Sequence, residues 1–172
     1  DAVCISGTHG KTTTTSMTTQ ILLDAGIDPT CVIGGKLPAI HGSGRVGKSP
    51  VMVCEACEFV DTFLKLYPDI AVILNIDADH LDFFKDLADV EHSFRAFAAL
   101  VPAGGLIVAN GDDANTADAL RGMDYVRFGF AETNDVCGKN FSADFREFDV
   151  YCGGALYCHP HLGVLGRHNA MN

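Results

Sequence analysis

The fold is decided by a stretch near the start of the chain, which reads AVCISGTHGKTTTT at residues 2–15. An apolar run comes first, two glycines follow it, and a lysine with four threonines comes next. Near-continuous apolar runs are typical of strands buried on both faces of a parallel sheet. Glycines permit a tight turn, and a helix that begins directly after the turn points its free amide groups at an anion. We therefore predict a strand, a phosphate-binding loop and a helix, in this order.

The loop offers both backbone and side-chain groups to a nucleotide. In such a loop a lysine reaches the β- and γ-phosphate oxygens, and the hydroxyl after it ligates Mg²⁺. The common pattern G-x-x-x-x-G-K-[ST] is not fully met, because Ile5 stands where its first glycine would be. The alternative is a glycine-rich turn with a surface lysine, which the strand–loop–helix context disfavours. The predicted phosphate-binding residues are Gly7, Thr8, His9, Gly10, Lys11, Thr12 and Thr13.

Further apolar runs predict four more strands, at residues 51–55, 70–76, 106–110 and 125–128. Apolar residues at helical spacing predict helices after the first strand, over 90–101 and over 113–121. In the first helix the apolar stripe consists of Met17, Ile21, Leu22 and Ala25. Strands that alternate with helices predict an α/β fold, with a mostly parallel sheet flanked by helices and right-handed crossovers.

The pattern changes in the C-terminal part of the chain. A small antiparallel sheet is predicted over about residues 136–165, beside the main one. It would contain an alternating strand, a hairpin and a third strand, at residues 141–145, 150–158 and 162–165. Residues 34–48 are rich in glycine and basic for this chain, and they are predicted to form a mobile loop.

Composition excludes several classes of protein. The chain has 172 residues, enough for one domain, and twelve basic against twenty-two acidic residues give a net charge of −10. This charge argues against nucleic-acid binding, and the absence of an apolar run of about 18 residues argues against a membrane span. Seven irregularly spaced cysteines indicate a reduced, cytoplasmic protein. Because the chain opens on a strand and stops where a helix begins, we interpret residues 1–172 as a single domain of a longer protein.

Polar residues stand at the ends of several apolar runs, among them Ser6, Glu55, Asn75 and Asn110. The carboxyl ends of parallel strands meet at one edge of a sheet, where ligands bind. We therefore expect the loop, Glu55 and residues 77–80 to line one crevice. Glu55 is a hard oxygen ligand suited to Mg²⁺, although a strand-end carboxylate can also face water. His80 is an unusual ligand for Mg²⁺, and a core position is its alternative.

Cys54 and Cys57 form a C-x-x-C, a spacing that is also found in zinc sites. On a strand these two side chains point to opposite faces, which disfavours joint ligation. The remaining ligands would have to come from Cys158, His159 and His161.

Four segments together resemble the Mur ligase family, at residues 7–15 (GTHGKTTTT), 55–58 (EACE), 75–82 (NIDADHLD) and 168–172 (HNAMN). The resemblance spans the whole chain and corresponds to the central ATP-binding domain of the family, which is P-loop NTPase-like. Cys57 replaces the family's usual aspartate and Phe59-Val60 replace a polar pair, so only Glu55 is carried over from that segment. Arg95 stands where many members have a carbamylated lysine, which the alanine-adding branch also lacks.

The resemblance implies an ATP-dependent, amide-forming ligase of peptidoglycan precursor synthesis. It implies that ATP, UDP-N-acetylmuramate and L-alanine are the substrates of the intact enzyme and that the reaction passes through an acyl phosphate. Lys11, Glu55 and His80 would be catalytic, and Mg²⁺ would be held by Thr12, Glu55 and His80. Adenine would be held by His168, Asn169 and Asn172. The flanking N- and C-terminal domains would be missing, so we expect weak binding of Mg²⁺–ATP and no ligation by this piece alone.

Three alternatives stay open. The piece could be only a nucleotide-binding module, or it could come from a muropeptide-recycling ligase or from a folylpolyglutamate-type ligase. His9 and the segment around Glu55 argue against the last of these.

Overall fold

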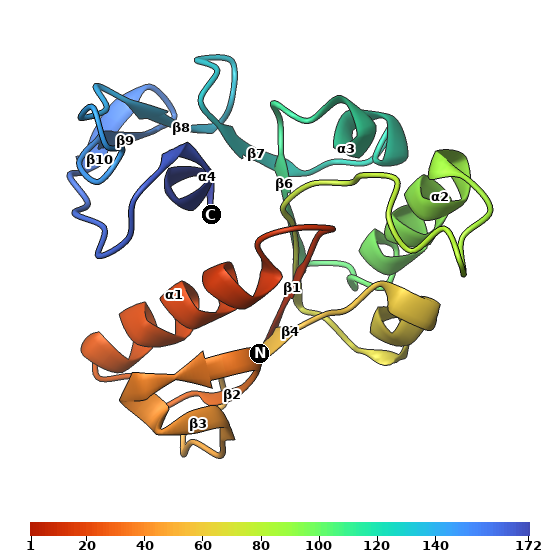
Figure 1. Cartoon of the computed structure of the whole chain (residues 1–172), viewed down its shortest axis with the longest axis horizontal. Coiled ribbons are helices and arrows are strands. Elements are labelled where there is room, and N and C mark those ends of the chain that lie inside the picture. The colour runs from red at the N-terminus through yellow and green to blue at the C-terminus, as the bar shows by residue number, and fades with distance from the viewer.

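Strand β1 (Ala2–Ser6) lies in the middle of a ten-stranded sheet in the computed structural model, which describes residues 1–172 (Figure 1). The strand order is β10-β9-β8-β7-β6-β5-β1-β4-β2-β3. The other strands are β2 (Thr30–Leu37), β3 (Gly42–Arg45), β4 (Met52–Glu55), β5 (Ile70–Ile73), β6 (Leu106–Asn110), β7 (Val126–Gly129), β8 (Val136–Lys139), β9 (Asp149–Cys152) and β10 (Ala155–Cys158). The helices are α1 (Lys11–Asp24), η1 (Pro38–Ile40), η2 (Phe59–Lys65), α2 (Leu87–Ala98), α3 (Ala114–Ala119) and α4 (Arg167–Met171).

Seven adjacent strands pair in parallel, in the order β2-β4-β1-β5-β6-β7-β8. The strands β3, β9 and β10 are antiparallel to their neighbours. The chain leaves β1 toward β2 and β4 on one side, then crosses to β5 on the other. Such a reversal opens a crevice at the carboxyl end of the central strand, where α/β proteins bind ligands. The predicted mostly parallel α/β fold is confirmed.

Two apolar cores pack on the two faces of the sheet. The larger one contains three fully buried phenylalanines, and the rings of Phe63 and Phe97 stack with centroids 4.7 Å apart while Phe94 meets Phe63 edge-on. The smaller core contains Ile5 and Val53 of the central strands, with Leu22 of α1 packed against it. No helix of the structure is both long and apolar enough to cross a bilayer.

The predicted apolar face of α1 is only partly correct, because Leu22 packs against the smaller core but Ile21 does not face the sheet. Its buried residues are Thr14, Thr15 and Thr19, whereas Ile21 is 67% exposed. The first turn of α1 is fixed by the loop before it, so the residues that meet the sheet are set by their spacing from that turn rather than by hydrophobicity. The Thr15 hydroxyl is satisfied within the helix, because it donates to the carbonyl of Lys11 at 2.7 Å, whereas the buried hydroxyls of Thr14 and Thr19 have no hydrogen-bond partner in the protein.

The prediction of a mobile loop over residues 34–48 is also wrong. Strand β2 continues to Leu37, and β3 pairs with it in an antiparallel hairpin. The glycines here serve close packing rather than mobility, since a Cβ on Gly47 would lie 2.1 Å from the carbonyl oxygen of Asp28. An ion pair between Arg45 and Asp28 joins the same two segments.

The antiparallel strands near the C-terminus exist, but they continue the main sheet instead of forming a second one, because β8 pairs with β7. The predicted hairpin is present as β9 and β10. Residues 141–145 and 162–165 are not strands. The ring of Phe141 instead packs against Phe130, Phe145 and Phe148, with centroids 4.9, 5.2 and 5.1 Å away, so the alternation of apolar residues reflects a ring cluster.

Candidate nucleotide site

The phosphate loop (residues 6–13) is bonded to the segment that follows β5. The amide of Thr8 donates to the Asn75 carbonyl at 3.1 Å, and the Thr8 hydroxyl accepts from the amide of Asp77 at 2.9 Å. The Asn75 side chain accepts from the amide of His9 at 2.7 Å and donates to its carbonyl at 2.9 Å. Asn75 and Asp77 therefore fix the loop from outside, a role that the sequence did not assign to them.

The backbone of the loop leaves the start of α1 open. Gly7 and Gly10 have φ angles of 142° and 87°, a region that glycine adopts without strain. A Cβ on Gly7 would lie 2.9 Å from the Cβ of Leu74. Gly10 stands at the N-cap of α1 and no side chain caps the first turn. The free amide groups and the positive end of the helix dipole fit an anion.

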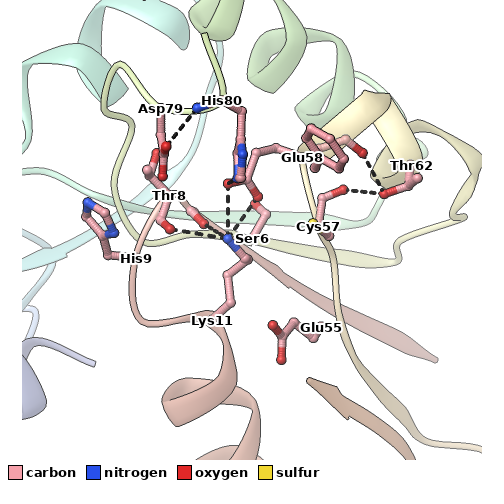
Figure 2. A network of polar contacts seen from close by, with 12 residues as sticks. Ser6, Thr8, His9, Lys11, Glu55, Cys57, Glu58, Thr62, Asp79 and His80 are labelled. Carbon is pink, nitrogen blue, oxygen red and sulfur yellow. Dashed lines mark hydrogen bonds and ion pairs between the residues drawn. The ribbon is translucent and has the colours of Figure 1, made fainter. Parts of the chain in front are cut away.

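The side chain of Lys11 folds back over the loop (Figure 2). Its ammonium donates to the carbonyls of Gly7 and Thr8 at 2.6 and 3.3 Å and to Glu58 Oε1 at 3.1 Å. Glu58 Oε2 lies 2.9 Å from the same nitrogen. Because Glu58 is only 1% exposed, this is a buried ion pair.

Glu58 is the site residue that the sequence analysis missed. It belongs to the segment at residues 55–58, in which only Glu55 is predicted to be a site residue. Its position was a usable signal for a site residue. Glu58 follows the strand-end acid Glu55 by three residues, so both acids lie near the same edge of the sheet. Its pairing with Lys11 is a product of the fold alone.

Thr12 and Glu55 form the second part of the site. The Thr12 hydroxyl donates to Glu55 Oε1 at 3.0 Å, and the amide of Gly34 in β2 donates to Glu55 Oε2 at 2.6 Å. A Cβ on Gly34 would lie 2.6 Å from this carboxylate, so a larger residue here would displace the Glu55 side chain. A hydroxyl and a carboxylate side by side are hard oxygen donors that fit Mg²⁺.

His80 stands on the other side of Glu58 (Figure 2). Its Nε2 lies 3.8 Å from Glu58 Oε1, and its ring centroid lies 4.9 Å from that of Phe59. The backbone of His80 is left-handed, with a φ of 54°, and its amide donates to Asp79 Oδ1 at 2.7 Å. Lys11, Glu58 and His80 thus form one continuous chain of polar contacts.

The chain makes a strained turn directly after Glu58, at Val60 and Asp61. Val60 and Asp61 have φ angles of 54° and 53°, which is costly for a β-branched residue. Asp61 accepts a hydrogen bond from the Ser93 hydroxyl of α2, which ties the turn to the larger core. Strain of this kind gathers at binding sites that the surrounding structure holds in place.

The C-terminal motif reaches the phosphate loop through one residue. Asn172 lies against Gly10, since a Cβ on that glycine would be 2.3 Å from Asn172 Oδ1. The Asn169 side-chain amide donates to the Leu165 carbonyl at 2.7 Å, and the His168 ring lies close to Gly166. A cavity of about 190 Å³ opens beside Asn172, between α4 and strands β7 and β8. Of the three predicted adenine residues, the structure brings only Asn172 to the loop.

The donors present fit a cation that takes part of its shell from elsewhere. No group of three or more His, Cys, Asp or Glu side chains gathers in metal-binding geometry. Thr12 and Glu55 would therefore hold Mg²⁺ together with phosphate and water oxygens, which is how this ion is usually bound. Arg95 donates to the carbonyls of Ala119 and Arg121 and takes no part in the site.

The C-x-x-C pair does not form a ligand set. Cys54 is buried, with its sulfur 3.3 Å from that of Cys4, whereas Cys57 is exposed.

The family model of the Mur ligase middle domain matches residues 5–172. The chain belongs to the Mur ligase family. It is 48% identical over 175 residues to a UDP-N-acetylmuramate–L-alanine ligase of Caldanaerobacter subterraneus subsp. tengcongensis, with 99% of this chain and 38% of that protein covered. A protein of the same name from Clostridium acetobutylicum is 45% identical, with the same coverage. The chain therefore spans 38% of the length of these curated relatives.

Solved structures of Mur ligases share the fold. UDP-N-acetylmuramate:L-alanyl-gamma-D-glutamyl-meso-diaminopimelate ligase from Neisseria meningitides matches with a TM-score of 0.84 and 31% identity, covering 99% of this chain and 57% of that one. The UDP-N-acetylmuramate–alanine ligase of Thermotoga maritima matches with a TM-score of 0.83 and 28% identity, covering 99% and 39%. The family and fold that the four motifs predicted are confirmed.

Proposed function

We propose that this chain is the ATP-binding unit of a UDP-N-acetylmuramate–L-alanine ligase, an enzyme of peptidoglycan precursor synthesis. The observation that carries the proposal is the convergence of the phosphate loop, the Thr12–Glu55 pair and His80 at the carboxyl edge of β1, β4 and β5. The names of the relatives that are 48% and 45% identical support the choice of substrate.

The proposed reaction has two steps. The carboxylate of UDP-N-acetylmuramate attacks the γ-phosphorus of ATP, giving an acyl phosphate and ADP, and the amine of L-alanine then displaces phosphate to form the amide. Lys11 offsets charge on the β- and γ-phosphate oxygens, and the loop amides of residues 7–13 orient them. Thr12 and Glu55 would hold Mg²⁺, and His80 would contribute to the binding of a second cation. When bound, these ions would supply positive charge to the phosphate oxygens.

The adenine end of the nucleotide is assigned to the C-terminal motif. Asn172 stands next to Gly10 and beside the cavity between α4 and the sheet, which supports this assignment. His168 and Asn169 are proposed to join it when nucleotide is bound.

A muropeptide-recycling ligase is the second candidate. The structure from Neisseria meningitides, whose name describes ligation of a tripeptide to UDP-N-acetylmuramate, supports it through a TM-score of 0.84. Its identity of 31% exceeds the 28% of the Thermotoga maritima alanine ligase but is lower than the 48% and 45% of the two curated alanine ligases, which favours the first candidate.

We further propose that the protein works in the cytoplasm. All seven cysteines are free thiols, and Cys57, Cys152 and Cys158 are exposed. Exposed free thiols persist in a reducing compartment.

Calorimetric titration of the 172-residue chain with Mg²⁺ and a non-hydrolysable ATP analogue tests nucleotide binding. We expect weak, Mg²⁺-dependent binding that Glu55→Gln reduces, and no effect of Glu147→Gln, a variant of an exposed acid outside the site. Absence of both heat and thermal shift for the unmodified chain would refute the proposal.

Turnover of the intact enzyme that contains this segment separates the two ligase candidates. L-alanine should be ligated to UDP-N-acetylmuramate and a tripeptide should not, and Lys11→Ala should abolish turnover. Ligation of the tripeptide in preference to L-alanine would favour the recycling enzyme.

A further inference from the structure

We propose that Glu58 is a positioning residue that competes with the nucleotide for Lys11. In the free chain its carboxylate holds the ammonium folded back on the loop, and a bound triphosphate exchanges a phosphate oxygen for this carboxylate. The inference rests on the proposed nucleotide binding and adds a residue that sets the affinity for the triphosphate.

The first argument is the number of donors on Lys11. An ammonium group has three N–H donors. In the structure they are directed to the carbonyls of Gly7 and Thr8 and to Glu58. A phosphate oxygen can therefore bind this nitrogen only if one of these acceptors withdraws. The two carbonyls belong to a loop that Asn75 and Asp77 fix, so the side chain of Glu58 is the acceptor that can leave.

The second argument is the burial of the carboxylate. Glu58 is 1% exposed, and the Lys11 side chain is 13% exposed. With almost no water around it, the negative charge acts on the ammonium with little screening. The same charge repels an incoming phosphate, so Glu58 both neutralises Lys11 and opposes the ligand. Removing this charge while keeping the shape should strengthen triphosphate binding.

The third argument is the presence of a second partner for Glu58. Both oxygens of Glu58 face the Lys11 nitrogen, since Oε1 accepts its hydrogen bond at 3.1 Å and Oε2 lies 2.9 Å away. His80 Nε2 is 3.8 Å from Oε1. Because Glu58 contacts both Lys11 and His80, a shift of its carboxylate away from Lys11 would also be felt at His80.

The test is a comparison of affinities in the 172-residue chain. Unmodified protein and the variants Glu58→Gln, Glu58→Asp and Glu132→Gln are titrated with Mg²⁺ and a non-hydrolysable ATP analogue, with tripolyphosphate and with adenosine. Glu132→Gln is the matched control, because Glu132 pairs with Lys139 at 2.8 Å on the surface. Thermal unfolding is measured on the same samples.

We expect Glu58→Gln to bind the ATP analogue and tripolyphosphate about tenfold more tightly, which corresponds to about 1.4 kcal/mol. Glu58→Asp keeps the charge but moves it away from Lys11 by the length of one methylene group. Its affinity for the same two ligands should therefore rise less, by about two- to threefold. Adenosine binding should not change, and Glu132→Gln should match the unmodified chain. A residue that only supports the fold would lower affinity or leave it alone, and would not raise it.

The inference would be overturned if Glu58→Gln unfolds at the same temperature as the unmodified chain but binds tripolyphosphate equally or more weakly. The proposed function would still stand in that case. If Glu58→Gln does not fold, the same comparison applies to Glu58→Asp. If the unmodified chain binds neither the ATP analogue nor tripolyphosphate, the proposed function fails together with the inference.

Discussion

Glu58 Oε2 lies 2.9 Å from the ammonium nitrogen of Lys11, and the carboxylate is almost completely buried. The lysine of the phosphate loop is therefore a partner within the fold as well as a candidate phosphate ligand. Any substitution of Lys11 acts on stability and on nucleotide binding at once, and the two effects need separate measurements.

Replacing Lys11 by alanine should destabilise the protein by about 3–5 kcal/mol, because it leaves the carboxylate of Glu58 buried without a partner. The double variant Lys11→Ala with Glu58→Gln should recover most of this loss, since the unpaired charge is gone. Urea unfolding followed by circular dichroism measures both. Lys139→Ala, which breaks the pair with Glu132 and a contact with the Tyr151 ring but leaves no carboxylate buried, should lower the midpoint much less. A double variant no more stable than Lys11→Ala would contradict the buried-charge explanation.

Gly10 and Gly154 provide a matched pair of glycines with left-handed backbones, at φ angles of 87° and 81°. Alanine at either position should cost about 1–2 kcal/mol for this conformation. At Gly10 the added Cβ also meets Asn172 Oδ1, whereas at Gly154 no atom lies within 4 Å. Gly10→Ala should therefore be the more destabilising and should also weaken nucleotide binding. Equal unfolding midpoints and equal nucleotide affinities would argue against contact between the loop and the C-terminal motif.

Phe97 lies at the centre of the larger core, stacked on Phe63 with 4° between the ring planes. Truncation to alanine removes a ring from a site without solvent and should cost about 3–5 kcal/mol. Tyr67→Ala is the control, because Tyr67 is 90% exposed and its loss should be nearly neutral. Denaturant unfolding measures the free energy of unfolding of both variants. A small decrease for Phe97→Ala would contradict the prediction and would mean that neighbouring side chains fill the cavity left by the ring.

The seven thiols should divide into two reactivity classes. The exposed cysteines at positions 57, 152 and 158 should react with a thiol reagent within minutes, and the buried ones at positions 4, 31, 54 and 137 should react only on unfolding. At Cys4 the hydrogen bond with Cys54, together with burial, raises the pKa of the thiol well above its usual range, so thiolate is scarce. Mass spectrometry of labelled peptides measures the rates. Rapid labelling of Cys4 in folded protein would contradict the packing of β1 against β4.

Local patterns were sufficient where one segment carries the whole signal. The apolar run of β1, the two glycines and the lysine specify strand, loop and helix without help from distant residues. The strand at residues 106–110 was predicted to the residue for the same reason, because it is a continuous apolar run between turn residues.

Patterns failed where a distant segment decides the outcome. The glycines of residues 34–48 indicate mobility when taken alone, yet Gly47 is held against the carbonyl of Asp28 in the β2–β3 region. The threonines of α1 look polar and solvent-facing, yet Thr15 and Thr19 are fully buried against the sheet.

The sequence by itself determined the family, the parallel sheet and the identity of the phosphate loop, because these depend on residues that are neighbours along the chain. Only the tertiary structure decided that Glu58 rather than Glu55 pairs with Lys11, that Glu55 bonds to Thr12 and Gly34, and that Asn172 reaches Gly10. The reason is physical. An acid's partner depends on which strands lie side by side and on how much water is excluded between them, and a linear pattern contains neither quantity.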